Sequence, residues 1–573
     1  MFLGGSVRIL GLVSDTHDSG IALLADGVPE FVVEEERLNR RKHTQRFPTC
    51  ALDAVLTQRG LTLRDVGALV TPWNVSRLRR TFAAAVLRRF PASLALTNKK
   101  SHPPQRNEVV FLNQRLRRDL KRQFPGAALP PLYNVGHHDS HAAAYFVSPF
   151  EEATVLVMDG YGDDAATSVY TGRGNRLERH WYTGIFNSLG MVYTFVTHYL
   201  GFAGFADEGK VMALAAFGED TYVARFRDLI RLTPDGRYQV DMSWFDYDAY
   251  GMLQPFKPKF LDAFGPPRLP NEPLTQRHKD LAHAVQSLTE DVILHVCRHL
   301  AKAHPSRNLV LAGGVALNCV ANARVRAETD YENVWVPPIA SDSGAPLGAA
   351  LWHHHQTLGH PRTYRLDDAA LGLAYSRDDV RRALEARGLA YEELPDPVLI
   401  ERAAKDLAAG KVVGWFQGRF EAGPRALGYR SILADPRNVA MRDTINAKIK
   451  HRESFRPFAP AIPRERVDEF FEFSGSDPFM TMAPRARPEK AHLIPAGVHV
   501  DQTGRIQTVD RATNPRYWQL IETFGRLTGV PVLLNTSFND QEPIVARPEE
   551  AIDCYLRTDL DALAIESFYV AKR

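Results

Sequence analysis

Short apolar runs separated by polar turns open the chain, and this pattern predicts β-strands. Three such runs occupy residues 7–13, 21–24 and 31–36. A related pattern returns at residues 153–159 and 167–171, where two apolar runs flank a turn of glycine and acidic residues. Strands joined by short turns that contain glycine are typical of hairpins. The recurrence of the pattern therefore predicts two similar lobes.

Helical periodicity follows the second of these patterns. Apolar positions recur at helical spacing over residues 275–304 and again over residues 346–355. Between them, an apolar strand at residues 309–315 runs into a pair of glycines. Because strands, turns and helices alternate in this way, we predict an α/β fold.

A polar, turn-rich stretch at residues 359–368 marks the predicted domain boundary. The elements predicted beyond it are helices at 377–387 and 398–409, and strands at 412–416, 507–509, 532–535 and 562–565. We therefore divide the chain into a domain of residues 1–360 and a domain of residues 368–573.

Composition and charge exclude several classes of protein. The 573 residues carry 70 Lys+Arg against 67 Asp+Glu, and this near balance indicates neither a nucleic-acid nor a membrane partner. A hydrophobic content of 45% and no uncharged apolar run of bilayer length exclude a fibre, a membrane channel and a disordered chain. The four cysteines form no CxxC pair, and the N-terminus lacks a charged start and a cleavage site, so we expect a cytoplasmic protein.

Arginine and lysine are concentrated in the segment 77–122, which is predicted to be mostly helical. Charge runs of this kind usually form a solvated helix face. The alternative is that this face contacts an acceptor substrate or a partner molecule, and the sequence leaves both interpretations open.

The sharpest local cluster of potential ligands is the run HHDSH at residues 137–141. If a helix begins here, His137 and His141 lie one turn apart on the same face, where both imidazoles can reach one metal ion. Asp159 and Asp342, each expected at a strand end, are the candidates to complete the site. Two imidazoles with two carboxylates suit Fe(II), Mn(II) or Zn(II). The alternative is that these histidines cap and pack a helix start.

Glycine turns next to acidic or amide residues form a second group, at residues 159–163, at Gly313 and Gly314 with Asn318, and at residues 342–344. Glycine lets backbone N–H groups approach phosphate oxygens, and the acids can hold a phosphate-bound metal ion. Each turn alone reads as an ordinary tight turn. Three of them at strand ends resemble the nucleotide cleft of actin-like ATPases and sugar kinases.

Two other patterns are interpreted as structural or coincidental. Residues 204–210 fit GxxxxGK, but Val211 stands where a P-loop needs Ser or Thr for Mg²⁺. Lys210 can still contact a phosphate within a different fold. The run of histidines at residues 353–355 and the single His198 are expected to pack or to be exposed.

The densest polar segments lie at residues 421–438 and 446–460. Their cations recur among glycine, proline and apolar residues, unlike a simple amphipathic face: Arg425, Arg430, Arg437, Lys448, Lys450, Arg452 and Arg456. Arg505 and Ser537 stand beside later predicted strands. Arginine and lysine in such settings suit phosphate binding. The alternative is a network of buried ion pairs.

A series of motifs spans nearly the whole chain: HDSGIALLADG, EEERLNRRKH, HHDSHAAAY, VMDGYGD, EGKVMALAAFG, AGGVALN, SDSGAPLGAA, GWFQGRFEAGPRALGYRSILADPR, IKHRESFRPFAP, QTV and LNTSFNDQEPIV. Together and in this order, they resemble the O-carbamoyltransferases of the NodU/CmcH type. The resemblance implies a two-lobed actin-like (ASKHA) N-terminal domain and a C-terminal YrdC-like α/β domain.

The resemblance also implies an activity in two steps. The YrdC-like domain would convert carbamoyl phosphate and ATP to carbamoyl-adenylate. The actin-like domain would transfer the carbamoyl group to a hydroxyl of a small-molecule acceptor, such as a secondary metabolite or antibiotic, and release AMP. A homodimer is expected on the same ground.

Residue roles follow from matching motif positions. The resemblance implies Fe(II), or another divalent metal, on His137, His141, Asp159 and Asp342. It implies ATP and carbamoyl phosphate, with Mg²⁺, at Gly313, Gly314, Asn318, Arg425, Arg430, Arg505 and Ser537, and on physical grounds Lys210 is expected to help hold the nucleotide. The catalytic residues would be His17, as the base near the acceptor hydroxyl, together with Lys42 and Lys450.

Two positions depart from the family pattern, Ala422 before GPRALG and Tyr429 within GYRS. Four other classes of protein compete with this interpretation. A hydrogenase-maturation carbamoyltransferase would carry paired CxxC motifs, and a sugar kinase would have no use for the Arg-rich C-terminal domain. A non-catalytic nucleotide-binding assembly protein would bind ATP without exchanging pyrophosphate. A carbamoyltransferase acting on a protein or tRNA would share the chemistry and differ in its acceptor.

Overall fold

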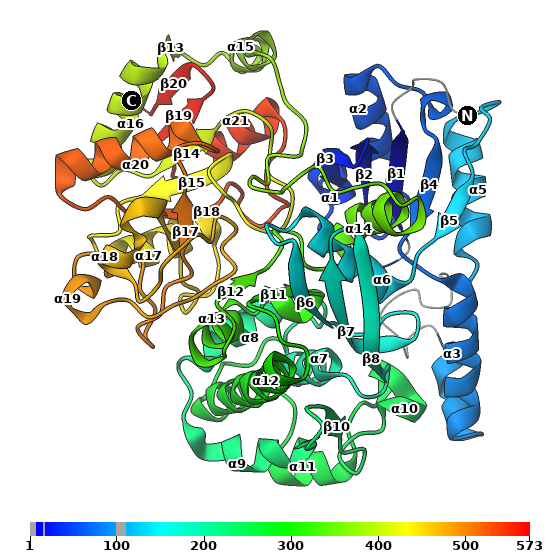
Figure 1. Cartoon of the computed structure of the whole chain (residues 1–573). Helices are drawn as coiled ribbons and strands as arrows, with labels where there is room; N and C mark the ends of the chain where they lie inside the picture. Colours follow the sequence, from blue (N-terminus) through cyan, green and yellow to red (C-terminus); the bar gives the residue numbers. More distant parts are fainter. Residues whose placement is uncertain (1–6, 15, 17, 99–109, 573) are drawn as a thin grey trace. The chain divides into compact units, whose positions relative to one another are not determined.

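The computed structural model describes residues 7–14, 16, 18–98 and 110–572, without the side chain of Lys448 (Figure 1). Contacts divide the chain into two compact units. The N-terminal unit comprises Met1–Glu36 and His43–Leu366, and the C-terminal unit comprises Arg37–Lys42 and Asp367–Arg573. The short segment Arg37–Lys42 thus belongs to the second unit, although it lies early in the sequence.

Two five-stranded sheets build the N-terminal unit, and their strand orders are the same. The first sheet has the order β3-β2-β1-β4-β5 and the second has the order β8-β7-β6-β11-β12. In both, the first three strands in sequence pair antiparallel and the last two join in parallel. The bounds are β1 Arg8–Val13, β2 Gly20–Ala25, β3 Val28–Glu34, β4 Ala68–Thr71, β5 Leu132–Asn134, β6 Glu152–Met158, β7 Ala165–Arg173, β8 Arg176–Gly184, β11 Asn308–Ala312 and β12 Asn333–Trp335. This duplicated topology confirms the two-lobed actin-like α/β fold.

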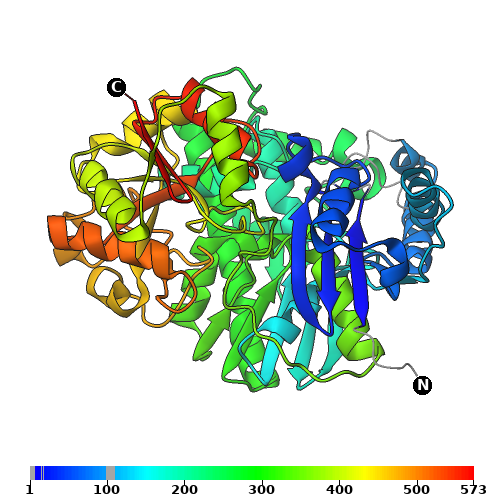
Figure 2. The same ribbon diagram turned by 90° about the horizontal axis from the view of Figure 1, so that it is seen from above.

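Helices surround both sheets (Figures 1 and 2). Those of the N-terminal unit are α2 Thr49–Arg59, α3 Val75–Arg88, α5 Leu112–Gln123, α6 His137–Ala142, α7 Leu189–Tyr199, α8 Glu208–Ala215, α9 Val223–Phe226, α10 Tyr247–Tyr250, α11 Pro258–Phe264, α12 Gln276–Ala303, α13 Cys319–Glu328 and α14 Ala345–Leu351, while α1 Glu35–Asn39 begins in it. A small hairpin, β9 Ile230–Leu232 and β10 Tyr238–Val240, lies outside the two sheets. Among the described helices, none combines the length and apolar character needed to cross a bilayer.

The long helix α12 confirms the helical pattern predicted for residues 275–304. Thr275 precedes it in a capping box with His278, which satisfies N–H groups of the first turn. The predicted strand 309–315 is shorter, because Gly313 has a φ of +89° and ends β11 at Ala312. The strand predicted for 31–36 likewise ends at Glu34, where the acidic first turn of α1 begins.

Helix α14 lies directly against β1 and α6, and two glycines permit this approach. A Cβ added at Gly11 would lie 1.9 Å from the carbonyl oxygen of Pro346 on α14. A Cβ added at Gly348 on α14 would lie 1.8 Å from the carbonyl oxygen of Ser140 on α6. Both distances are far below van der Waals contact, so only glycine fits, and α14 can buttress the helix that carries the HHDSH run.

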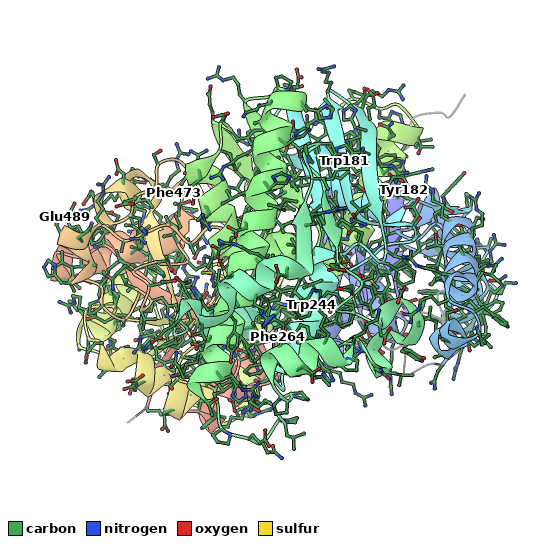
Figure 3. All side chains as sticks on the ribbon, turned by 90° about the horizontal axis from the view of Figure 1, so that it is seen from below. Trp181, Tyr182, Trp244, Phe264, Phe473 and Glu489 are labelled. Atoms are coloured by element: carbon green, nitrogen blue, oxygen red, sulfur yellow. The ribbon has the colours of Figure 1, made fainter. Side chains whose placement is uncertain are left out.

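Aromatic side chains form a separate packing centre around α10 and α11. Phe256 and Phe260 are stacked with ring centroids 3.9 Å apart, and Trp244 lies 5.8 Å from Phe264 (Figure 3). Aromatic pairs in this distance range add stability beyond the area that they bury. This cluster anchors the part of the chain that follows α8.

A π-helix, Trp352–Thr357, continues α14 and carries three buried histidines. His354 stacks on His360 with centroids 4.5 Å apart, and His355 Nδ1 lies 3.0 Å from the carbonyl oxygen of His360. The interpretation of this run as packing residues is therefore confirmed. Burial, and then the neighbouring histidines, lower the pKa of His354 to about 4.

This low pKa predicts a loss of stability in acid. The unfolded chain takes up a proton near the ordinary pKa of 6.5, whereas folded His354 does so only near pH 4. Neutral His354 therefore contributes to the free energy of unfolding above pH 6.5. This contribution, about 1–2 kcal/mol, is lost as the pH falls from 6.5 to 4. Thermal unfolding of the wild type and of His354→Asn at several pH values between 6.5 and 4 measures this loss of stability. The wild type should lose more stability than the variant, and an equal loss in both would contradict the prediction. His180→Asn, at an exposed histidine, is the control.

The C-terminal unit is a three-layer α/β domain built on an eight-stranded sheet of order β13-β20-β19-β14-β15-β18-β16-β17. Its strands are β13 Glu392–Glu393, β14 Val413–Phe416, β15 Arg430–Ala434, β16 Ala459–Pro463, β17 Gln507–Val509, β18 Leu533–Ser537, β19 Ala562–Ile565 and β20 Phe568–Ala571. Its helices are α15 Arg377–Ala386, α16 Asp396–Ala408, α17 Ala440–Ile445, α18 Val467–Phe470, α19 Pro488–Ala491, α20 Pro515–Thr528 and α21 Pro548–Arg557.

Strand alternation distributes the core of this unit over the two faces of the sheet. On β19, Ala562 and Ala564 pack with α16 and α20, whereas Leu563 and Ile565 pack with α15 and α21. This period of two is what a strand covered on both faces requires. The strands predicted at 507–509 and 562–565 are confirmed with the same bounds.

Candidate functional site

Four residues predicted as metal ligands come together at one edge of the second sheet. His137 and His141 lie on α6, Asp159 directly follows β6, and Asp342 opens the short 3₁₀ helix Asp342–Gly344. All four side chains are buried. They converge because α6 begins at His137, which places His137 and His141 one turn apart, while Asp159 stands at the carboxyl end of β6.

The spacing of the four donor atoms fits a single metal ion. His137 Nε2 lies 3.2 Å from His141 Nε2, 3.3 Å from Asp159 Oδ2 and 3.2 Å from Asp342 Oδ1. His141 Nε2 lies 3.8 Å and 3.5 Å from the same two carboxylate oxygens. Ligands held at about 2.1 Å in a tetrahedral arrangement are about 3.4 Å apart. The donors therefore surround a space of the size that a divalent ion needs.

Neighbouring groups orient these ligands. His137 Nδ1 lies 3.2 Å from the carbonyl oxygen of Pro72, and the ring stacks on Trp73 with centroids 4.1 Å apart. Because a carbonyl can only accept, Nδ1 carries the proton and the lone pair of Nε2 faces the other ligands. Asp159 Oδ1 accepts a 2.9 Å bond from Gly314 N–H, which leaves Oδ2 toward the histidines.

Charge in the cluster favours a bound cation. Burial opposes protonation of His137, but the carboxylates of Asp342 and Asp159 outweigh it and raise its pKa well above 6.5. Burial alone would raise the pKa of Asp159, yet His137 and His141 hold it at about 2. Two carboxyl groups beside two imidazoles form a net acceptor of positive charge, which either a proton or a metal ion can supply.

The predicted nucleotide residues of the N-terminal unit divide into two groups. Gly313 and Gly314 adjoin the cluster, because Gly314 donates to Asp159 and a Cβ at Gly313 would collide with the Met158 carbonyl at 2.2 Å. Asn318 instead caps α13 and bonds Gln286.

Lys210 and His17 complete the predicted residues of this unit. On α8, Lys210 Nζ lies 3.1 Å from Asp207. His17, the predicted base, lies outside the described residues. Next to it in sequence, Asp18 groups with Glu36 and His43, and His43 Nδ1 lies 3.2 Å from Asp18 Oδ1.

A cluster of like charges marks the C-terminal unit. Burial lowers the pKa of Lys450 well below 10.5, and the charges of Arg452, Arg456 and Lys42 lower it further. Burial, followed by Arg456 and Arg505, lowers the pKa of Arg452 to about 9. Cations that depress one another in this way favour a bound polyanion, because an anion would relieve both the repulsion and the desolvation. These five residues are called the cation cluster below.

Hydrogen bonds hold the Lys450 side chain at the C-terminal end of β18. Its Nζ donates to Ser537 Oγ over 3.1 Å, to the Asn539 carbonyl over 2.8 Å and to Asn539 Oδ1 over 2.6 Å. Only 2% of the residue is exposed. The structure therefore brings Lys450, Ser537 and Asn539 together where β18 ends, as expected if the LNTSFN run follows a strand end.

Arg430 differs from the other predicted phosphate ligands. It is fully buried, and its guanidinium lies 3.4 Å over the Phe416 ring. The side chain donates to four backbone carbonyls, those of Gln417, Gly418, Tyr429 and Ala546. Four of its five N–H groups are thus used within the protein, and in this structure Arg430 fixes the loop before β15; its role at a phosphate stays a prediction. Arg425 lies half-buried in that loop.

Arg452 and Arg456 were named only among the cations suited to phosphate binding, and no individual role was assigned to them or to Asn539. Arg452 and Arg456 stand in the same IKHRESFRPFAP motif as Lys450, so their spacing could have indicated them. Asn539 follows Ser537 by two residues in LNTSFN. Proximity to Lys450 is the signal that separates these residues from ordinary surface cations.

Two arginines in the described part of the basic segment, Arg77 and Arg89, pair with aspartates of the N-terminal unit. Arg77 donates to Asp139 over 3.1 Å, and Arg89 donates to Asp246 and Asp248 over 2.8 and 2.7 Å. Arg77 thereby reaches the HHDSH run from α3. The residues of this segment between 99 and 109 lie outside the described chain.

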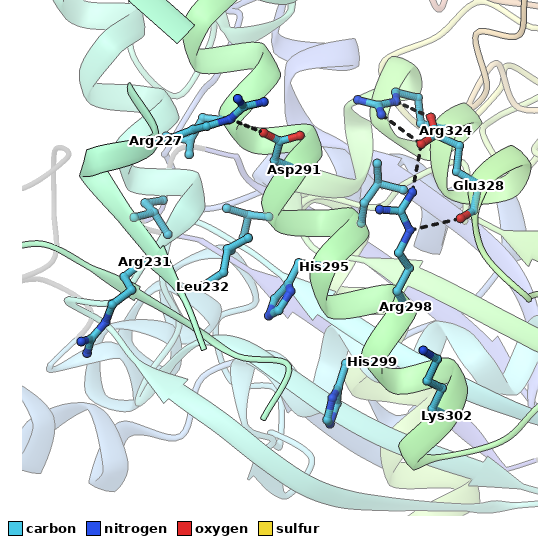
Figure 4. Close-up of a pocket in the computed structure, with 14 residues that line it drawn as sticks. Arg227, Arg231, Leu232, Asp291, His295, Arg298, His299, Lys302, Arg324 and Glu328 are labelled. Atoms are coloured by element: carbon cyan, nitrogen blue, oxygen red, sulfur yellow. Dashed lines mark hydrogen bonds and ion pairs between the residues drawn. The ribbon is translucent and has the colours of Figure 1, made fainter. Parts of the chain in front are cut away.

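A separate cavity of about 720 Å³ lies along the C-terminal half of α12 (Figure 4). Its walls carry Arg227 paired with Asp291 over 2.9 Å, and Arg298 paired with Glu328 over 3.1 Å. Its acids are thus neutralised, and Lys302 adds a further cation to the rim. Within the described chain, none of the predicted site residues lines this cavity, so it is distinct from the two clusters above.

Comparison with known proteins identifies the family. The model described as Carbamoyltransferase N-terminus matches residues 8–351, and the model described as Carbamoyltransferase C-terminus matches residues 404–572. The uncharacterized protein sll1178 of Synechocystis sp. is 42% identical over 604 residues, covering 99% of this chain and 97% of that protein. Nodulation protein NolNO of Sinorhizobium fredii is 36% identical over 578 residues, covering 97% and 79%.

Among solved structures, component A of the (R)-2-hydroxyglutaryl-CoA dehydratase of Acidaminococcus fermentans covers 61% of this chain and 99% of its own. It is 12% identical with a TM-score of 0.32, too remote to bear on function. The family models, in contrast, match both units of the chain. This chain therefore belongs to the carbamoyltransferase family of the NodU/CmcH type and is a carbamoyltransferase with both domains of that family.

Proposed function

We propose that this carbamoyltransferase is an ATP-dependent O-carbamoyltransferase that works in two steps. In the C-terminal unit, carbamoyl phosphate, ATP and water give carbamoyl-adenylate, phosphate and pyrophosphate. In the N-terminal unit, the carbamoyl group passes to an acceptor hydroxyl, and AMP leaves. The observation that carries the proposal is the presence of two chemically different clusters in one carbamoyltransferase chain, a His/Asp cluster in one unit and the cation cluster in the other.

The cation cluster supports the first step. Hydrolysis of carbamoyl phosphate yields carbamate, whose oxygen attacks the α-phosphorus of ATP and expels pyrophosphate. Negative charge develops on the phosphate oxygens, and fixed cations in a buried setting stabilise it strongly. We assign this role to Lys450, Arg452, Arg456 and Arg505, with Ser537 as a hydrogen-bonding partner and Arg425 at the adjoining loop. Mg²⁺ is expected with ATP.

The His/Asp cluster supports the second step. His137, His141, Asp159 and Asp342 would hold a divalent ion, expected to be Fe(II), which when bound supplies positive charge for the phosphate of the adenylate. The Gly313–Gly314 turn adjoins this cluster, because Gly314 N–H donates to Asp159 Oδ1 over 2.9 Å, and the nucleotide would lie beside this turn. His17 would take the proton of the acceptor hydroxyl as general base. AMP is then a good leaving group, so the carbamoyl carbon accepts the hydroxyl oxygen.

We propose a small-molecule hydroxyl compound as the acceptor, such as a secondary metabolite or antibiotic. The domain limits proposed for the two activities remain residues 1–360 and 368–573. Mass spectrometry of candidate metabolites incubated with the enzyme should find a gain of one carbamoyl group. The same gain on a protein or tRNA instead would replace the proposed acceptor class.

One assay tests the two-step proposal. Purified wild-type protein, with iron and without oxygen, should release pyrophosphate from carbamoyl phosphate and ATP and form carbamoyl-adenylate. Omission of carbamoyl phosphate is the control, because a kinase or simple ATPase would still consume ATP. If ATP binds but neither pyrophosphate nor the adenylate appears, the chain is a non-catalytic nucleotide-binding protein and the proposal is wrong.

A further inference from the structure

Helix α6, which carries both histidines of the His/Asp cluster, needs support from other elements. It spans only His137–Ala142, and its N-cap residue, Gly136, has no side chain to cap the first turn. Helices of this length are not stable alone in water, so tertiary contacts must set the direction of α6. Metal ligands hold an ion tightly only where neighbouring groups fix each ligand. The contacts around α6 therefore bear on how well the cluster can bind a metal ion.

Asp139 lies between the two histidines in the sequence of α6, and both of its carboxylate oxygens are bonded to other elements. Oδ1 accepts from the Tyr170 hydroxyl of β7 over 2.9 Å, and Oδ2 accepts from Arg77 Nη1 of α3 over 3.1 Å. The Asp139 side chain is only 11% exposed, so its ion pair with Arg77 is screened less than a surface pair. Asp139 thus joins α6 both to β7 and to α3.

Gly136 leaves the space that the Arg77–Asp139 pair occupies. A Cβ added at Gly136 would lie 2.2 Å from Asp139 Oδ2 and 2.8 Å from Arg77 Nη1. Both distances are shorter than van der Waals contact, so a larger residue would push the pair apart. The pair is therefore packed directly against the start of α6, where His137 stands.

The start of α3 contacts α6 in two ways. Asn74 caps α3 by accepting from Arg77 N–H over 3.0 Å, which fixes Arg77 in the first turn. Just before Asn74, the Pro72 carbonyl oxygen lies 3.2 Å from His137 Nδ1, and Trp73 stacks on the same imidazole. One short segment of chain therefore orients the His137 ring and also holds α6 through Asp139.

The far end of α3 is held as well. Arg89 donates to Asp246 and Asp248 over 2.8 and 2.7 Å, and Arg88 lies 3.5 Å from Asp248. Asp248 lies on α10, and Asp246 directly precedes that helix. A helix bonded at both ends is a rigid support for Arg77. The arginines at the ends of α3 thus make fixed contacts within the protein.

We propose that Arg77 is a positioning residue of the His/Asp cluster, which acts through Asp139 to hold α6 where His137 and His141 meet the two aspartates. This inference rests on the proposed metal site and deepens it, because metal affinity would then depend on an arginine of the basic segment. In this role, Arg77 contacts neither the ion nor a substrate.

The metal affinity of the full-length protein tests the proposal. Arg77→Met removes the charge and its donors, and it should weaken Fe(II) binding about 10- to 100-fold, the range for lost outer contacts of metal ligands. Because Arg77 acts through Asp139, the double variant with Asp139→Asn should bind Fe(II) no more weakly than the weaker single variant. Arg77→Lys keeps a cation and should recover part of the affinity. Arg80→Met is the matched control, since Arg80 is exposed on the same helix and its Nε contacts the Ser76 carbonyl within it.

Two further readouts separate positioning from general damage. The absorption spectrum of bound Co(II), which reports the arrangement of the ligands, should change in Arg77→Met at saturating Co(II). The melting temperature of the metal-free protein should fall by no more than about 2 °C, because the ion pair is only partly buried.

Three results would overturn the proposal. The first is wild-type Fe(II) affinity and an unchanged Co(II) spectrum in Arg77→Met. The second is a weaker affinity accompanied by a fall in melting temperature of more than about 5 °C, which would indicate damage to the fold. The third is multiplication of the single effects in the double variant. If the wild type itself binds no divalent ion, the proposed metal site fails, and this result differs from equal binding by the wild type and the variant.

Discussion

Lys450→Met is expected to slow pyrophosphate release from carbamoyl phosphate and ATP by at least ~100-fold, the range found when one preorganised charge is removed from a catalytic site. Methionine is unbranched like lysine, is one atom shorter and keeps most of its volume, so the substitution mainly removes the charge and its donors. In the wild type, those donors face Ser537 Oγ and Asn539 Oδ1 at 3.1 and 2.6 Å. A bound polyanion that replaces these acceptors would interact with the full charge of the buried ammonium group.

The electrostatics of the site make this effect larger than that of a surface lysine. Burial, Arg452 and Arg456 all lower the pKa of Lys450, so its charged form is destabilised until an anion arrives. The ammonium group is therefore poised to interact more strongly with phosphate than a solvated ammonium would. Removing it takes away an interaction that strengthens as charge develops on the phosphates.

The Lys450→Met assay needs two comparisons. Lys405→Met removes a lysine on α16 whose side chain is 59% exposed, and it should leave pyrophosphate release unchanged. AMP release from synthetic carbamoyl-adenylate should persist in Lys450→Met, because that reaction is assigned to the N-terminal unit. A variant that still forms the adenylate at the wild-type rate would remove Lys450 from the proposed mechanism. Loss of both reactions would indicate damage to the fold.

The His/Asp cluster could be predicted because its geometry is mostly local. The i, i+4 spacing fixes His137 and His141 on one face of any helix that begins there. Asp159 closes a strand whose repeated pattern was visible in the sequence, so its place at a sheet edge followed from the topology. Only the approach of Asp342 needed the tertiary fold, and the strand-end position of its motif indicated that as well.

The roles of the arginines could not be predicted in the same way. Arg430 and Arg452 stand in similar surroundings of glycine, proline and apolar residues in the sequence. They differ in what the folded chain places next to them, four carbonyl oxygens for Arg430 and other cations for Arg452. Long-range contacts of this kind leave no local pattern in the sequence, because every residue type carries a backbone carbonyl group.

The placement of residues 37–42 in the C-terminal unit could not be predicted, for a related reason. The EEERLNRRKH motif has the composition of an ordinary charged helix end, and α1 does end at Asn39. Nothing in that composition shows that Arg37 and Arg40 bond carbonyls near residues 421 and 543. The change from α-helix to π-helix after α14 also could not be predicted, because the histidines of the π-helix continue the helical sequence pattern without a break.

Asp159→Asn is expected to remove the metal ion and to slow carbamoyl transfer on the order of 1000-fold, or about 4 kcal/mol of transition-state stabilisation. The substitution is selective because the two carboxylate oxygens have different partners. Oδ1 accepts from Gly314 N–H over 2.9 Å, and an asparagine can keep this bond. Oδ2 faces His137 and His141, and an amide N–H₂ there would donate to imidazole nitrogens that must act as ligands.

The metal content and the two half-reactions together decide the outcome. Wild-type protein should bind about one Fe(II) per chain, and Asp159→Asn should bind less than about a tenth of that at the same iron concentration. AMP release from synthetic carbamoyl-adenylate should fall with the metal, whereas pyrophosphate release should stay at the wild-type rate, because the cation cluster is untouched. Asp220→Asn, at an aspartate whose side chain is 89% exposed, is the matched control for both measurements. Full metal content in Asp159→Asn would remove this aspartate from the ligand set, and an equal loss of pyrophosphate release would contradict the assignment of the two steps to separate clusters.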